Sequence, residues 1–297
     1  MRTPREQFAA TTTDLLDEDA RTALVWAEIS GRYFEEAWRR HPDRVVNVGI
    51  REQLLVNVGA GMALTGMRPV VHTISSFLVE RAFEQVKLGF AHQGVGGVLV
   101  GVGGSYDVSA GGRTHQAPGD VALMDTLPDV HVHAPGTARE VDEALRGAVA
   151  ADGLHYVRVV EQVNAESYPQ DGRLHRVRGG GRALVVAFGP MLAPVLEATA
   201  GLDVGVLYAS RVRPFDVAGL RAALPASGAV QVVLVEPWLS GTSARVVAEA
   251  LPDVPHRLLA LGVQRRELRR YGSPAEHAAA YGLDPAGIRR SIAAFAR

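Results

Sequence analysis

Glu52 is the residue of this chain whose type and setting most suggest chemistry. It follows a short apolar segment, 45–48, and a turn at Gly49, and it begins a predicted helix rich in glycine and alanine. The unpaired N–H groups and the macrodipole of a helix start favour an acidic residue, so Glu52 can be an ordinary first-turn charge. A carboxyl group in apolar surroundings can instead exchange a proton with a buried ligand. The stretch by itself leaves both interpretations open.

Other motifs of nucleotide and metal chemistry are incomplete. Gly101 and Gly103 follow a predicted strand, but Tyr106 stands where the third glycine of a dinucleotide-binding G-x-G-x-x-G motif would fall, and no helix is predicted to begin there. The chain has no Walker A motif, no H-E-x-x-H spacing and no cysteine, which excludes disulfides, thiolate metal sites and cysteine catalysis. We interpret the histidines of the predicted strands as core or edge residues: His72, His131 and His133.

The composition indicates a globular α/β protein. A formal net charge of −1 gives no basic footprint for nucleic acid or anionic membranes. No apolar run approaches bilayer-spanning length, and the N-terminus has no signal-peptide core. We therefore expect a cytoplasmic protein, and 297 residues suffice for two domains of ordinary size.

The elements that must position Glu52 alternate between strands and helices. Because this rhythm is typical of parallel strands joined by helical crossovers, it predicts a mainly parallel sheet covered by helices on both faces. We expect helices over 6–18, 33–40, 77–90, 121–127 and 137–150, one more after Glu52, a Gly-rich loop over 103–119, and strands over 23–27, 45–48, 69–74, 97–102, 130–135 and 155–160.

The alternation restarts after a Gly-rich and polar stretch, which predicts a second α/β domain. We place the first domain at residues 1–165, a linker at 166–182 and the second domain at 183–297. In the second domain we expect strands over 183–188, 204–208, 230–235 and 257–261, with helices between them and a helical segment over 270–297.

Several blocks of the first domain resemble the pyrimidine-binding domain of transketolase-like thiamine diphosphate enzymes. They are HPDR with VGIREQ (41–53), GMA with GMRP (61–69), FLVERAFEQ (77–85), GRTHQ (112–116) and LPDV with AP (127–135), in family order at near-family spacing. Residues 180–297 resemble the transketolase C-terminal domain, with RVRPFD (211–216) and VEP (235–237) in place. The resemblance implies a two-domain α/β fold of this kind.

The resemblance also implies roles for particular residues. Glu52 stands where a glutamate hydrogen-bonds the ring nitrogen of the cofactor aminopyrimidine and so promotes loss of the thiazolium C2 proton; Gln53 follows it. Phe77 matches the aromatic residue that stacks on the pyrimidine, and Ile74 stands where a second aromatic is common. His115, with Gln116 beside it, matches a histidine of the substrate channel. These residues are the expected catalytic and cofactor-binding groups.

Departures from the family pattern concern the substrate. Where sugar-phosphate transketolases carry a histidine, a hydroxyl-reading aspartate and a phosphate-binding arginine, this chain has Gly103, Gly111 and Glu161. A carboxylate repels a phosphate dianion. Arg5 matches a second phosphate-contacting arginine and Arg32 replaces a small hydroxyl residue. We therefore expect a substrate other than a standard pentose phosphate, with Arg32 open to binding the carboxylate of a 2-keto acid.

The resemblance further implies a partner chain. Full-length family members place a diphosphate-binding domain, with a Gly-Asp-Gly motif that ligates Mg²⁺, ahead of the pyrimidine domain, and neither Gly119-Asp120-Val121 nor Gln170-Asp171-Gly172 fits it. We expect the second half of a split transketolase, active with an N-terminal subunit that holds Mg²⁺ and the diphosphate, in a heterotetramer of two copies of each chain. This chain is expected to contain no metal site.

Three functions follow as alternatives. The first is a thiamine diphosphate transferase that moves a two-carbon ketol or related acyl-anion unit to an aldehyde or similar acceptor. The second is the β subunit of a 2-oxo acid dehydrogenase, against which the Thr-His-Gln block and the Gly-Ile-Arg-Glu-Gln sequence argue. The third is a non-catalytic regulatory or assembly subunit, against which the joint presence of Glu52, Phe77 and His115 argues.

Overall fold

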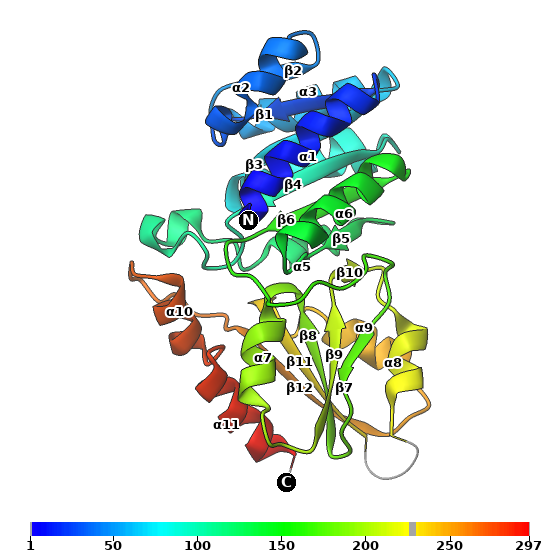
Figure 1. The fold of residues 1–297 in the computed structure, drawn as a ribbon, viewed down its shortest axis with the longest axis vertical. Coiled ribbons are helices and arrows are strands. Elements are labelled where there is room, and N and C mark those ends of the chain that lie inside the picture. Colours follow the sequence, from blue (N-terminus) through cyan, green and yellow to red (C-terminus); the bar gives the residue numbers. More distant parts are fainter. Residues whose placement is uncertain (1, 226–229, 297) are drawn as a thin grey trace.

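Two mainly parallel β-sheets, each covered by helices, form the protein (Figure 1). A computed structural model describes residues 2–225 and 230–296. The first sheet has the order β10 (Arg211–Arg213), β5 (His131–His133), β6 (Leu154–Val159), β4 (Gly97–Val102), β3 (Arg68–Ile74), β1 (Thr22–Trp26) and β2 (Val45–Asn47). The second has the order β12 (His256–Val263), β11 (Val230–Leu239), β8 (Ala183–Phe188), β9 (Val204–Ala209) and β7 (His175–Arg178). The predicted fold class is confirmed.

Antiparallel pairing is confined to one edge strand of each sheet. β10 pairs antiparallel with β5, and β7 pairs antiparallel with β9, while every other pair among the described strands is parallel. Neither β7 nor β10 was predicted, and β7 lies inside the stretch 166–182 that we predicted to be a linker. Because β10 follows β9 in the chain yet joins the first sheet, the two sheets are tied together by backbone hydrogen bonds.

Helices cover both faces of the first sheet. One face packs on α1 (Pro4–Glu18), α2 (Gly31–Arg40) and α6 (Ala138–Ala150), and the other on α3 (Glu52–Leu64), the segment 76–91 and α5 (Asp120–Met124). The predicted helix over 77–90 is divided: π-helical turns at Ser76–Arg81 and Val86–Ala91 flank the short α4 (Phe83–Gln85). The chain starts α1 with a capping box in which Thr3 and Glu6 satisfy each other's backbone N–H groups.

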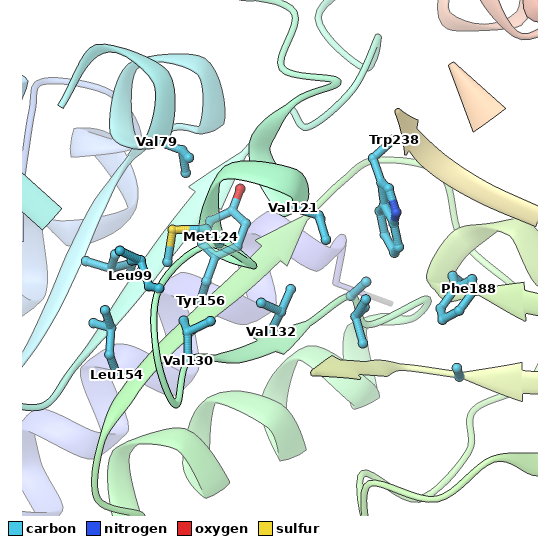
Figure 2. Close-up of a cluster of buried hydrophobic side chains, with 14 of the residues drawn as sticks. Val79, Leu99, Val121, Met124, Val130, Val132, Leu154, Tyr156, Phe188 and Trp238 are labelled. Carbon is cyan, nitrogen blue, oxygen red and sulfur yellow. The ribbon is translucent and has the colours of Figure 1, made fainter. Parts of the chain in front are cut away.

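The second sheet is covered in the same way. α7 (Leu192–Ala198) and α11 (Pro285–Phe295) pack on one face, and α8 (Val217–Ala223) and α9 (Ala244–Ala250) on the other; α10 (Pro274–Tyr281) precedes α11 at the edge (Figure 1). Apolar packing continues between the two sheets. One cluster of buried side chains includes Val121 and Met124 of α5 and Val132 of β5, together with Phe188 and Trp238 of the second sheet (Figure 2). Within the described ranges, no helix is long and apolar enough to cross a membrane.

Three histidines stack against one another where β5 and β6 begin. His131 and His155 are paired across the two strands with ring centroids 4.5 Å apart, and His133 lies 5.3 Å from His155. One bond joins His133 Nε2 and His155 Nδ1 at 3.1 Å. Burial lowers the pKa of all three, that of His155 to about 4, and the nearby Arg211 lowers each further. The cluster is therefore neutral near pH 7.

Acid should weaken the fold through this cluster. A histidine of pKa 6.5 when unfolded and about 4 when folded takes up its proton preferentially in the unfolded chain, so stability falls as the pH drops from about 6.5 to 4. For His155 alone the expected loss between pH 7 and pH 5 is about 2 kcal/mol. Urea unfolding at both pH values measures it. His155→Gln should shrink the difference, whereas the same change at the exposed His92 should not; equal pH dependence in both variants would contradict this account.

Candidate functional site

The carboxyl ends of the parallel strands of the first sheet bring the site residues together. Gly49, in the left-handed conformation at φ 69°, turns the chain from β2 into α3, where Glu52 is the first helical residue. A side chain would strain that backbone, so glycine suits the turn. Glu52 is only 2% exposed although it begins a helix. Its burial distinguishes it from an ordinary first-turn charge, which stays in water.

Arg81 makes contact with both Glu52 and Phe77. Its Nη1 donates to Glu52 Oε2 at 2.7 Å, and its guanidinium carbon lies 3.9 Å from the centroid of the Phe77 ring. The π-helical turn Ser76–Arg81 places the two side chains on one side of the segment. A planar cation with N–H donors thus lies on the aromatic face while it bonds the buried carboxylate. We did not predict a role for Arg81, although it stands in the same sequence block as Phe77.

His115 completes this group, whereas Gln116 points elsewhere. The His115 ring meets the Phe77 ring edge-on with centroids 5.1 Å apart, and His115 Nδ1 lies 2.9 Å from the Thr114 hydroxyl. Gln116 is buried, and its amide lies 3.3 Å from Nε2 of His277 on α10, so it joins the Gly-rich loop to the second sheet's helices. Gln53 is exposed and its amide donates to the Arg81 carbonyl at 3.3 Å.

A cavity of about 630 Å³ is lined by three of the residues predicted to contact substrate, Arg5, Arg32 and Glu161, and by Ile74, which was predicted to bind the cofactor; His115 and Gln116 are not among its lining residues. Its walls include four side chains that we predicted from different parts of the chain: Arg5 on α1, Arg32 on α2, Ile74 at the end of β3 and Glu161 just after β6. Gly103, also in the wall, adopts φ 70°, and a Cβ there would lie 2.3 Å from Val108 Cγ2. A histidine at this position would require Val108 to move.

Asp107 lies beside Glu161 in the cavity wall and was not predicted. The backbone N–H of Glu161 is shared between its two carboxylate oxygens at 3.2 Å each. Burial, together with the negative charge of Glu161, raises the pKa of Asp107 to about 6 against the opposing hydrogen bond from Glu161 N. Asp107 and Glu161 make this part of the wall acidic, and Arg5 and Arg32 place positive charges in the wall of the same cavity. A carboxylate inside a Gly-rich loop gives no periodic signal, so the sequence offered little to find it.

At two other glycines of the loop, neighbouring side chains leave no room for a Cβ. A Cβ on Gly111 would lie 2.8 Å from Cγ of His115, so the imidazole fills the space that an aspartate side chain would need. A Cβ on Gly104 would lie 2.4 Å from the guanidinium of Arg158. Arg158 is fully buried, and its Nε donates to Asp120 at 2.7 Å. It therefore serves the core and is not part of the cavity wall.

The fold is that of the transketolase class of α/β proteins. The family described as "Transketolase, pyrimidine binding domain" matches residues 2–165, and the chain belongs to this thiamine diphosphate-dependent family. It is 47% identical over 297 residues to the "Uncharacterized 33.6 kDa protein in fasciation locus" of Rhodococcoides fascians, covering 97% of this chain and 93% of that protein.

Characterised relatives are similar over most of this chain but are longer. The 1-deoxy-D-xylulose-5-phosphate synthase of Acidovorax sp. (strain JS42) is 33% identical over 94% of this chain and 45% of the synthase. The chain thus spans about half the length of these synthases. Among solved structures, "Split gene transketolase, inactive beta4 tetramer" superposes with a TM-score of 0.86 at 24% identity, over 100% of this chain and 99% of that one. Transketolase from Campylobacter jejuni gives 0.79 at 16% identity, over 98% of this chain and 46% of its own; at these identities both show the fold alone.

Proposed function

We propose that this chain is the pyrimidine-binding subunit of a two-chain, thiamine diphosphate-dependent transferase of the transketolase type, which moves a two-carbon ketol or related acyl-anion unit to an aldehyde or similar acceptor. The observation that carries the proposal is the grouping of Glu52, Phe77 and His115 at one edge of the sheet. A regulatory subunit without chemistry has no need to keep a carboxylate 2% exposed next to an aromatic face.

The residues present fit the aminopyrimidine half of the cofactor. The thiazolium ring of thiamine diphosphate supplies a stabilised carbanion when the cofactor is bound. Glu52 is proposed to share its proton with the pyrimidine ring nitrogen, Phe77 to stack on the ring, and Ile74 and Gln53 to bound the pocket. Glu52 already bonds a planar, N–H-bearing group that lies on Phe77, namely the Arg81 guanidinium, so the two side chains are placed to hold a flat nitrogenous ring together.

His115 is proposed to move or hold a proton on the substrate side. Its ring lies against Phe77, and the residue is only half-buried, so part of it remains accessible to a substrate. In the same proposal Gln116 supports the position of the loop through His277, and Arg5, Arg32 and Glu161 contact the substrate in the cavity.

The diphosphate and Mg²⁺ are proposed to belong to a partner subunit. Among the residues that the structure describes, no group of three or more His, Asp or Glu side chains is arranged to hold a metal ion. A diphosphate requires a divalent cation or a nest of N–H groups. The similar split-gene transketolase chain forms a β4 tetramer described as inactive, which supports a requirement for a second kind of chain. We propose two copies of each chain in a cytoplasmic enzyme.

Reconstitution tests the function. This chain should bind thiamine diphosphate with Mg²⁺ tightly only after a subunit that carries the Gly-Asp-Gly domain is added, and calorimetry with and without that subunit measures the difference. The mixture should then consume a 2-oxo acid or ketose donor in the presence of an aldehyde. Tight binding by this chain alone would overturn the two-chain proposal, and a mixture that binds the cofactor but exchanges no C2 proton would favour a non-catalytic subunit.

Glu161→Arg should increase the use of a phosphorylated substrate. In the wild-type complex, xylulose 5-phosphate is expected to be a poor donor, because Glu161 and Asp107 place two carboxyl groups in the cavity wall. Charge reversal supplies a guanidinium for the phosphate oxygens and should raise kcat/KM at least about tenfold, equivalent to ~1.4 kcal/mol. Glu161→Gln, which only removes the repulsion, is the control and should give a smaller gain. Ordinary transketolase efficiency in the wild type would refute the altered pocket.

A further inference from the structure

Three hydrogen-bonded side chains, Arg5, Ser30 and His72, connect the cavity to the core of the first sheet; we call them the relay. Arg5, in the cavity wall, donates from Nε to Ser30 Oγ at 2.9 Å. Ser30 Oγ lies 2.8 Å from His72 Nε2, and His72 Nδ1 lies 2.9 Å from the Val100 carbonyl oxygen on the adjacent strand β4. Ser30 is 7% exposed and His72 is fully buried. The relay therefore links the guanidinium of Arg5, in the cavity wall, to the buried centre of the sheet.

The direction of each bond follows from its ends. A carbonyl oxygen only accepts, so His72 Nδ1 carries the proton and Nε2 has a lone pair. Ser30 must then donate its hydroxyl proton to Nε2, which leaves its oxygen to accept from Arg5 Nε–H. Every donor meets an acceptor in one order, Arg5 to Ser30 to His72 to Val100, and no other order satisfies the carbonyl.

His72 has surroundings that an apolar residue would suit equally well. Its ring lies 4.6 Å from that of Phe8 and 5.9 Å from that of Phe34. Burial lowers its pKa to about 3, so the imidazole is neutral at physiological pH and does not lose its lone pair to protonation. A buried polar group costs free energy unless its hydrogen bonds are made. Here both nitrogens are bonded, and one of the bonds leads to Arg5.

Ser30 also occupies a costly backbone conformation. It adopts φ 64° and ψ 3° just before α2, a left-handed conformation that favours glycine. Such a conformation in a non-glycine residue persists where the surrounding structure requires it. Glycine would relieve the strain, but only a side chain with a hydroxyl can connect Arg5 to His72.

The two terminal nitrogens of Arg5 are available to bind a ligand. In the described part of the chain, its hydrogen bond is made through Nε, so Nη1 and Nη2 remain for a partner in the cavity. Two parallel N–H donors on a fixed guanidinium match the two oxygens of a carboxylate. Glu161 and Asp107 share the cavity and disfavour a dianionic phosphate more strongly than a monoanion, because repulsion scales with charge.

We propose that His72, acting through Ser30, is a positioning residue that fixes Arg5 to bind the carboxylate of a small monoanionic substrate in this cavity. The inference rests on the proposed function for the identity of the cavity as a substrate site, and it names the charged group that the substrate presents. Because the whole relay and cavity belong to this chain, its test requires neither the partner subunit nor the cofactor.

The test measures binding of pyruvate, used as a small carboxylate probe, to the isolated chain by saturation-transfer NMR titration. Arg5→Ala should weaken binding at least tenfold. Ser30→Gly, which suits the left-handed backbone and removes the hydroxymethyl side chain, should weaken it three- to tenfold, and so should His72→Phe; the double variant should be no worse than either, since the two act in series. Phe8→Leu alters the same aromatic surroundings without touching the relay, and should leave the affinity within twofold.

Chemical rescue provides a readout that a merely structural role would not change. Guanidinium ion at tens of millimolar should restore pyruvate binding to Arg5→Ala but not to Arg5→Ala/Ser30→Gly, because the ion needs the Ser30 hydroxyl to hold it. Wild-type affinity in both Ser30→Gly and His72→Phe would overturn the relay. No pyruvate binding by the wild type, or equally tight binding of inorganic phosphate, would overturn the carboxylate assignment. The relay could pass these tests while the chain catalyses no transfer with any partner subunit. That result would refute the proposed function and leave the relay in place.

Discussion

Glu52→Gln is expected to slow hydrogen–deuterium exchange at C2 of thiamine diphosphate by about 10²- to 10⁴-fold in the complex with the partner subunit. Glutamine keeps the size of the side chain and can still accept a hydrogen bond from Arg81 through its amide oxygen. It cannot release or take up the proton that the pyrimidine nitrogen has to share. Proton NMR of the bound cofactor after acid quench measures the exchange.

The exposed Glu84, on the neighbouring α4, provides the control. Glu84→Gln should leave exchange unchanged, and calorimetry should show that Glu52→Gln still binds the cofactor within about tenfold of the wild type, since stacking on Phe77 is retained. Wild-type exchange in Glu52→Gln would place the proton chemistry on another group. Loss of binding without loss of exchange in the bound fraction would reduce Glu52 to a binding residue.

Asp120→Asn is expected to destabilise the chain by about 3–5 kcal/mol, because it leaves a buried guanidinium without its counter-ion. Asp120 and Arg158 are both almost completely buried, with Arg158 Nε 2.7 Å from Asp120 Oδ2. The same oxygen accepts from the Tyr156 hydroxyl at 2.9 Å, and Arg158 Nη2 donates to Ser105 Oγ at 2.6 Å. The network connects α5, β6 and the Gly-rich loop. Urea unfolding followed by circular dichroism gives the free energy directly.

Two control variants distinguish the loss of stability caused by an unpaired buried charge from the loss that any Asp→Asn substitution causes. Asp120→Asn/Arg158→Met removes both charges and should recover much of the lost stability, as expected for a buried pair whose desolvation offsets its attraction. Asp253→Asn breaks the exposed pair with Arg221 and should change stability little. A small loss in Asp120→Asn, similar to that in Asp253→Asn, would mean that water reaches Arg158.

The regular elements could be predicted because their signals are local. Buried strands such as β4 and β8 are continuous apolar runs, and the helices between them follow at fixed rhythm. β7 and β10 were missed because three or four residues rich in arginine have no periodic apolar signal, and only their pairing with distant strands makes them strands. The π-helical turns around α4, which lie against α3, were not predicted either.

The family resemblance named most residues of the candidate site, and the structure shows which of them lie close together. Glu52, Phe77 and His115 lie together as the resemblance implied, and Arg5, Arg32, Ile74 and Glu161 line one cavity. Contacts between residues far apart in the chain were not predictable. His72 was rightly interpreted as a core histidine, yet its bond to Ser30 joins positions 42 residues apart. Asp107 acquires its significance from Glu161, 54 positions away, and Arg81 from Glu52, 29 positions away, as well as from the nearby Phe77.

The position of Arg81 has a consequence for how any planar ligand enters. In the proposed cofactor site, a ring that bonded Glu52 Oε2 and stacked on the face of Phe77 that Arg81 covers would have to displace the guanidinium that makes both contacts. Ligand binding there would be an exchange of one planar partner for another, and the affinity would be lower than the new contacts alone would give, by the free energy needed to detach the arginine. In the proposed site Arg81 would thus be an internal competitor of the ligand, and a subunit that drew Arg81 away would increase the affinity without touching the ligand.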